Sequence, residues 1–127
     1  MNSVSTKAIK QLKNTIGKLK FLGKDNAIEI AGGEFHVSKQ ILKDIFNNVD
    51  LMDQCEKSIN HATLLKSECD KIDEIHHCSM EEFTTEKKYN LIILRYCIGY
   101  LDRPSLNKFL MKLSTMLRSS EGTVKRA

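Results

Sequence analysis

The sequence has no tryptophan, no two cysteines separated by only two residues, and no long apolar run. Its four cysteines are Cys55, Cys69, Cys78 and Cys97, and their spacing does not fit a zinc ribbon. No segment approaches the roughly 20 apolar residues of a membrane-spanning helix, and the amphipathic, lysine-bearing N-terminus is unlike a signal peptide. These absences exclude a zinc-ribbon module and predict an intracellular protein, cytoplasmic or nuclear, with reduced thiols.

The length and charge of the chain predict one ordinary globular domain, 1–127. A chain of 127 residues can bury about two thirds of the surface that it exposes when unfolded. Hydrophobic residues make up 41% and charged residues 28%, as is usual for soluble domains. The net charge of +4 permits an acidic partner. We expect a mixed, solvated surface rather than a nucleic-acid site, and the alternative is a basic module that binds nucleic acid through the Lys7–Lys24 helix.

Hydrophobic periodicity predicts alternating helices and strands. Residues 6–22 form an amphipathic helix, expected to pack on the core over 26–127; a basic helix on a membrane surface is the alternative. Further helices are predicted over about 37–46, 55–66 and 104–117. Strands are predicted over 27–30, 49–53, 72–78 and 89–94, with a further one beginning at Thr123. This alternation favours a parallel α/β sheet with helices on both faces.

The stretch Asn26–Phe35 reads as a buried strand, a glycine turn and the start of a helix. This is the first half of a nucleotide-binding βαβ unit, although any α/β protein has glycine turns after strands. Glu29 lies inside the strand, where a carboxylate needs donors to offset its burial. Asp53 follows the glycine turn by about 20 residues and ends a strand, where such folds place an acid against ribose hydroxyls.

Residues 27–122 resemble the class I S-adenosylmethionine-dependent methyltransferases, over about three quarters of the chain. Within these they are most similar to the protein alpha-N-terminal methyltransferases, which methylate the amine of a protein's first residue. The matching segments are Glu29–Phe35, Val49–Asp53, Cys78–Phe83 and Tyr89–Leu101. The resemblance implies a Rossmann-like parallel sheet in the order 3-2-1-4 with a possible short fifth strand, S-adenosylmethionine as cofactor, and a protein N-terminus or another protein as partner.

The resemblance also implies the residues of the site. Those expected to bind the cofactor are Glu29, Ala31, Gly33, His36, Asp53, Met80, Glu81 and Arg95. Those expected to face the substrate are Tyr96 and Tyr100. No catalytic residue is assigned and no metal is expected.

Several positions depart from the family pattern. Ala31 and Phe35 replace glycines, and the Phe35 ring is expected to fill cofactor space or to alter how the helix begins. His36 replaces a basic residue and is mostly neutral near pH 7. Glu81 and Arg95 replace polar amides, Tyr100 replaces a histidine, and the C-terminal edge of the sheet is expected to be missing.

These departures predict a methyltransferase-like protein with weak or lost activity, a pseudoenzyme. The alternative is an inactive subunit that keeps the fold as a structural or assembly partner in a protein complex. The sequence leaves open whether the chain is an enzyme.

Two weaker patterns carry no site. The run His76-His77-Cys78 contains metal-binding residue types, but adjacent side chains of a strand point to opposite faces and cannot all converge. Cys97 has no base placed beside it by the sequence, so it is expected to be a packed thiol.

Overall fold

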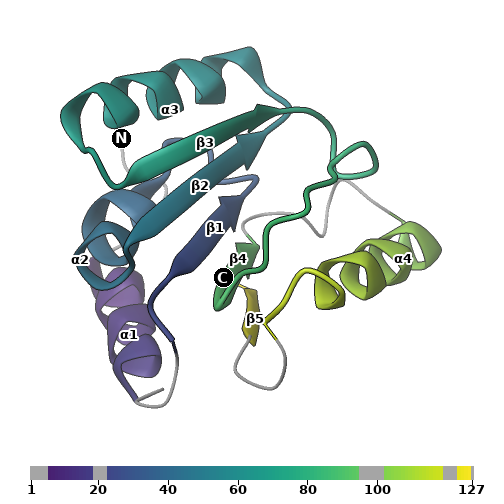
Figure 1. Ribbon diagram of the computed structural model, residues 1–127, viewed down its shortest axis with the longest axis horizontal. Coiled ribbons are helices and arrows are strands. Elements are labelled where there is room, and N and C mark those ends of the chain that lie inside the picture. Colours follow the sequence, from purple (N-terminus) through teal and green to yellow (C-terminus); the bar gives the residue numbers. More distant parts are fainter. Residues whose placement is uncertain (1–5, 19–22, 95–101, 119–122, 127) are drawn as a thin grey trace.

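The computed structural model describes residues 6–18, 23–94, 102–118 and 123–126. These residues form a parallel sheet in the order β3-β2-β1-β4-β5, with helices on both faces (Figure 1). The strands are β1 (Asn26–Ile30), β2 (Asn48–Asp53), β3 (Ile72–His77), β4 (Leu91–Leu94) and β5 (Thr123–Arg126). The helices are α1 (Thr6–Gly17), the π-helical η1 (Ser38–Leu42), α2 (Lys43–Ile45), α3 (Glu56–Glu68) and α4 (Arg103–Ser114). The predicted α/β class and strand order 3-2-1-4 are confirmed, and β5 is the fifth strand.

The central strands are buried on both faces because the sheet lies between two layers of helices. Alternate residues of each strand face opposite layers. The layer containing α1, η1, α2 and α3 covers Ala27, Val49, Leu51, Leu91 and Ile93. The layer containing α4 covers Ile28, Ile30, Met52, Ile92 and Leu94, together with its own Phe109 and Leu113. This double burial explains why β4 is apolar without alternation.

The first helix was predicted over 6–22. In the described residues helix α1 spans Thr6–Gly17, with a turn at Lys18. Residues 19–22 lie outside the described part of the chain. Ile9 and Ile16 are buried in the core cluster, so α1 packs on the domain as expected and its apolar face does not meet a membrane. Among the described helices, none has the length and apolar character to span a bilayer.

The strand predicted over 89–94 begins two residues later, at Leu91. Tyr89 instead pairs with the segment after α4, since its N–H donates to the Met116 carbonyl at 2.7 Å and its carbonyl accepts from the Arg118 N–H at 2.9 Å. The side chain of Asn90 holds β1 in register with β4, because its Oδ1 accepts from the N–H groups of Asp25 and Asn26, both at 3.1 Å.

Candidate cofactor site

The turn after β1 contains three residues with left-handed backbone conformation. Their φ angles are 57° at Ala31, 63° at Gly33 and 59° at Phe35. These are the positions at which the resembling family has glycines. The backbone therefore keeps a glycine-type conformation at two positions that carry side chains, at a cost of about 1–2 kcal/mol for each L-residue. Such strain persists only where the surrounding structure holds the backbone in place.

Packing beneath the turn supplies that support. The Phe35 side chain is fully buried in the core cluster with Ala27 and Ile41. A Cβ added at Gly32 would contact Phe35 Cδ1, and it would lie 2.8 Å from Phe35 Cε1 and 2.9 Å from Glu29 Oε2. The Phe35 ring thus lies under the turn, on the face of the sheet that α1, η1, α2 and α3 cover. It does not line the cavity described below.

Glu29 joins the strand to the start of the helix. Its carboxylate is fully buried, and Oε1 accepts a hydrogen bond from the Ser38 N–H at 2.8 Å. This hydrogen bond offsets part of the free-energy cost of burying the carboxylate. The segment that follows forms a π-helical turn, Ser38–Leu42, before the short α2. Phe35 does not line the cavity, so its ring does not fill the space expected for the cofactor.

Asp53 ends β2 beside the same turn. Its Oδ2 accepts from the Gly33 N–H at 3.1 Å, and its Oδ1 accepts from the Cys55 N–H at 3.0 Å. The carboxylate is 8% exposed. Each carboxylate oxygen has a second lone-pair direction, so Asp53 braces the turn and can still accept a hydrogen bond from a ligand hydroxyl.

A cavity of about 310 Å³ opens at the carboxyl ends of β1, β2 and β3. It is lined by Ala31, Gly33, Met52, Asp53, Gln54, Cys55, Ser58, Cys78 and Met80. Ligands of open parallel sheets bind at this edge of the strands, and this volume is at the lower end for small-molecule sites. An adjoining hollow of about 420 Å³ shares Gly33 with this cavity and is also lined by Lys57 and His61.

The structure brings together four of the residues expected to contact the cofactor: Ala31, Gly33, Asp53 and Met80. His36 does not line this cavity; its Nε2 lies 3.9 Å from Glu34 Oε1. Glu81 lines a separate hollow against α4. Arg95, Tyr96 and Tyr100 lie outside the described residues, as does Cys97.

Two thiols that line the cavity, those of Cys55 and Cys78, were not among the site residues that the sequence predicted. The backbone N–H groups of Ser58 and Lys57 at the start of α3 lower the pKa of the exposed Cys55 thiol. Burial, with the nearby charge of Glu82, raises the pKa of Cys78. Cys78 directly follows β3 and Cys55 is the second residue after β2, a signal that could have placed both thiols at this edge of the sheet.

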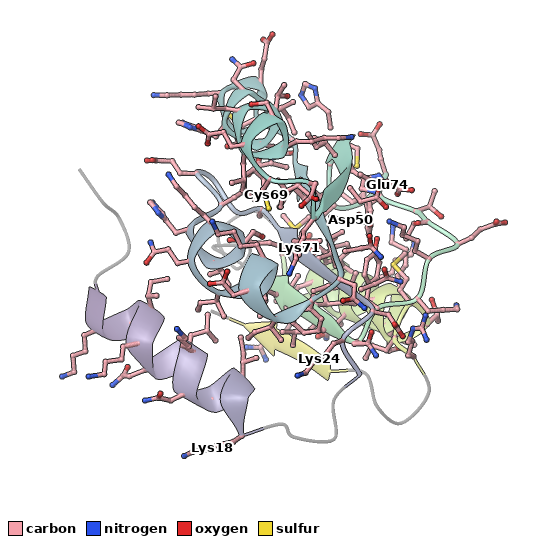
Figure 2. All side chains as sticks on the ribbon, turned by 60° about the vertical axis from the view of Figure 1, so that its left-hand side comes forward. Lys18, Lys24, Asp50, Cys69, Lys71 and Glu74 are labelled. Carbon is pink, nitrogen blue, oxygen red and sulfur yellow. The ribbon has the colours of Figure 1, made fainter. Side chains whose placement is uncertain are left out.

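A buried charge network on the α4 face was also missed. Asp50 in β2 is 1% exposed, and its carboxylate accepts hydrogen bonds from Lys87 Nζ at 3.0 Å, from the Tyr89 hydroxyl at 2.6 Å and from the Glu74 N–H at 2.9 Å. Figure 2 shows Asp50 and Glu74 close together at this place. Burial and the Asp50 carboxylate raise the pKa of Tyr89 well above its usual value. The network fixes the loop before β4 against β2 and β3.

Three side chains at this network have the types and the spacing of metal ligands. Asp50, Glu74 and His76 can bring their ligand atoms within 4.8 Å of one another. The ammonium group of Lys87 lies 3.0 Å from Asp50 Oδ1 and 3.8 Å from Glu74 Oε2, so a cation of the protein's own already neutralises these carboxylates. The neighbouring His77 faces elsewhere, with its Nε2 3.2 Å from the Gln54 carbonyl oxygen.

Comparison with known proteins places this geometry in a class. An S-adenosylmethionine-dependent methyltransferase of Leishmania major superposes with a TM-score of 0.84 at 21% identity, covering 91% of this chain and 47% of that one. The chain therefore has the fold of the S-adenosylmethionine-dependent methyltransferases.

Sequence comparison identifies the family within this class. Residues 2–125 match the AdoMet dependent proline di-methyltransferases, and the chain belongs to that family. It is 28% identical over 98 residues to the Xenopus laevis N-terminal Xaa-Pro-Lys N-methyltransferase 1-B. The aligned segment covers 76% of this chain and 44% of that protein. It is 31% identical over 88 residues to the Dictyostelium discoideum alpha N-terminal protein methyltransferase 1. The aligned segment covers 68% of this chain and 33% of that protein. The chain thus spans less than half the length of these relatives.

Proposed function

We propose that this chain binds S-adenosylmethionine, or its demethylated product, in the cavity at the carboxyl ends of β1–β3. The observation that carries this proposal is the turn Ala31–Phe35, in which the left-handed Gly33 donates its N–H to the Asp53 carboxylate at 3.1 Å, at the wall of a cavity that both residues line. A turn without a Cβ at Gly33 lets a ligand approach the main chain closely. The Asp53 carboxylate fits the cofactor as a hydrogen-bond acceptor, because a carboxylate accepts from the two hydroxyls of a ribose.

Each residue of the cavity has a separate proposed role. Asp53 would hold the ribose, and Met80, which is 5% exposed, would pack against the adenine ring. Glu29 would act from beneath by fixing the turn. Lys57 and His61 in the adjoining hollow would face the cofactor's carboxylate. His36 was expected in this role, but it does not line the cavity. When bound, the cofactor supplies an activated methyl group.

We further propose that the substrate class is a protein N-terminus and that turnover by this chain is weak or lost. The names of the relatives support the substrate class. Methyl transfer needs the amine uncharged and held in line with the methyl group, and the described residues include no second carboxylate in the cavity to accept the amine's proton. The strained backbone at Ala31 and Phe35 supports the alternative of an inactive subunit.

Cofactor binding is tested by isothermal titration calorimetry with S-adenosylhomocysteine. Asp53→Ala should weaken binding by about 1.5–3 kcal/mol, the range for a hydrogen bond to a charged group. Asp44→Ala is the matched control, since Asp44 is an exposed acid in α2. Equal affinities for the wild type and Asp53→Ala would reject the assignment of Asp53 as the residue that binds the ribose.

Activity is tested by radiolabelled methyl transfer to peptides that begin with a small residue, proline and lysine. We expect turnover several powers of ten below that of a competent relative run in parallel, because each missing contact costs about one or two kcal/mol. Cofactor binding without turnover would favour the inactive subunit. Robust cofactor-dependent turnover would overturn the proposal of weak activity.

A further inference from the structure

The charges of the chain are segregated. Residues 1–24 contain six lysines and neither aspartate nor glutamate, whereas the remaining residues contain 14 lysines and arginines against 16 acids. The entire net positive charge of the protein therefore comes from its first 24 residues. Such asymmetry between parts of a chain indicates a polyanionic or membrane partner.

Helix α1 displays this charge on one side. Ile9 is 8% exposed and Ile16 is 3% exposed, and both face the core. Lys7, Lys10 and Lys13 are exposed and follow one another at three-residue intervals, about 4.5 Å apart along the helix axis. Among the described residues, none of these three lysines has an acidic partner within ion-pair distance.

The buried apolar face of α1 decides which partner fits. Insertion into a membrane and docking into another protein's groove both use the apolar face of an amphipathic helix. Here that face is already covered by the domain. Only the lysine face is available, and charge alone is enough to bind the phosphate backbone of a nucleic acid.

We propose that the Lys7–Lys10–Lys13 face of α1 binds the phosphate backbone of nucleic acid without sequence preference. The proposal is independent of the cofactor site. Helix α1 contacts η1, and Figure 1 shows it near the start of β1, whereas the arrowheads of β1, β2 and β3 point away from it. Figure 2 shows Lys18 at the end of α1 and Lys24 in the segment that leads into β1. The cavity at the carboxyl ends of the strands stays open when α1 is occupied.

The test is fluorescence anisotropy with a labelled 20-base-pair duplex over a series of salt concentrations. Three phosphate contacts predict a slope of about −3 for the logarithm of the association constant against the logarithm of salt concentration. Changing Lys7, Lys10 and Lys13 together to Gln should weaken binding at low salt by roughly tenfold or more and flatten this slope. Because the three side chains are exposed, circular dichroism should show an unchanged fold.

The matched control changes three other exposed lysines, Lys66, Lys71 and Lys108, to Gln, so that the net charge falls equally. We expect this variant to lose much less affinity than the α1 variant. Equal losses in the two variants would overturn the proposal, because net charge rather than α1 would then decide binding. Tighter binding of poly-glutamate than of the duplex would also overturn it, in favour of an acidic protein partner. Absence of salt-sensitive duplex binding by the wild type would overturn it outright.

Discussion

Replacing Gly32 by alanine tests the packing that holds the turn. The added methyl group would contact the Phe35 ring and lie 2.9 Å from Glu29 Oε2. Neither neighbour can easily withdraw, since both are fully buried and Phe35 already has a strained φ of 59°. Overpacking of a close-packed core costs about 1–3 kcal/mol, and we expect a loss near 3 kcal/mol because both contacts are rigid.

The loss is measured by thermal and urea unfolding. With about 2.1 cal/mol/K of unfolding entropy per residue and 127 residues, 3 kcal/mol corresponds to a fall in Tm of roughly 10 °C. Gly17→Ala is the matched control, because a Cβ there meets nothing within 4 Å. In a Phe35→Ala background, Gly32→Ala should cost much less, since its main clash is gone. Equal stability of Gly32→Ala and Gly17→Ala would refute this account of the turn.

Three further predictions concern the buried network and the thiols. Asp50→Asn should destabilise the protein by about 3 kcal/mol because it removes the buried charged partner of Lys87 and leaves that ammonium only Asp73 and Glu74, whereas Tyr89→Phe should cost only about 1–2 kcal/mol; equal losses in urea unfolding would contradict the network. The Lys87 hydrogen bond lowers the pKa of Asp73, so its stabilisation is present above about pH 4 and is lost as pH falls through the depressed pKa; Asp73→Asn should lack this part of the acid-induced loss. Cys55 should be alkylated by iodoacetamide faster than Cys78 at pH 7.5, because their pKa values move in opposite directions, and peptide mapping that gives the reverse order would contradict this.

The sheet could be predicted from sequence because its signals are local. Apolar runs such as Leu91–Leu94 and the glycine turn after β1 define strands and connections without reference to the rest of the chain. The order of the strands came from resemblance to a family. Amphipathic spacing likewise placed α1, whose described residues end at Gly17.

The arrangement around the turn could be predicted only in part. The position of Asp53 at a strand end was sufficient to place it beside Gly33, because parallel strands end at a common edge. The burial of Phe35 under the turn was not predictable, since a left-handed φ for phenylalanine contradicts local preference and depends on tertiary packing. The Asp50–Lys87–Tyr89 network joins residues 37 and 39 positions apart, a separation at which sequence carries no pairing signal.

The central claim is that the cavity beside the Ala31–Phe35 turn binds an S-adenosyl cofactor. The most direct test is a titration of isotope-labelled protein with S-adenosylhomocysteine, followed by amide nuclear magnetic resonance. We predict saturable shifts of the Gly33, Asp53, Cys55 and Met80 amides, while those of Lys10 and Lys13 in α1 stay in place. Saturable shifts confined to other residues, or no shifts at millimolar ligand in the folded protein, would contradict the claim.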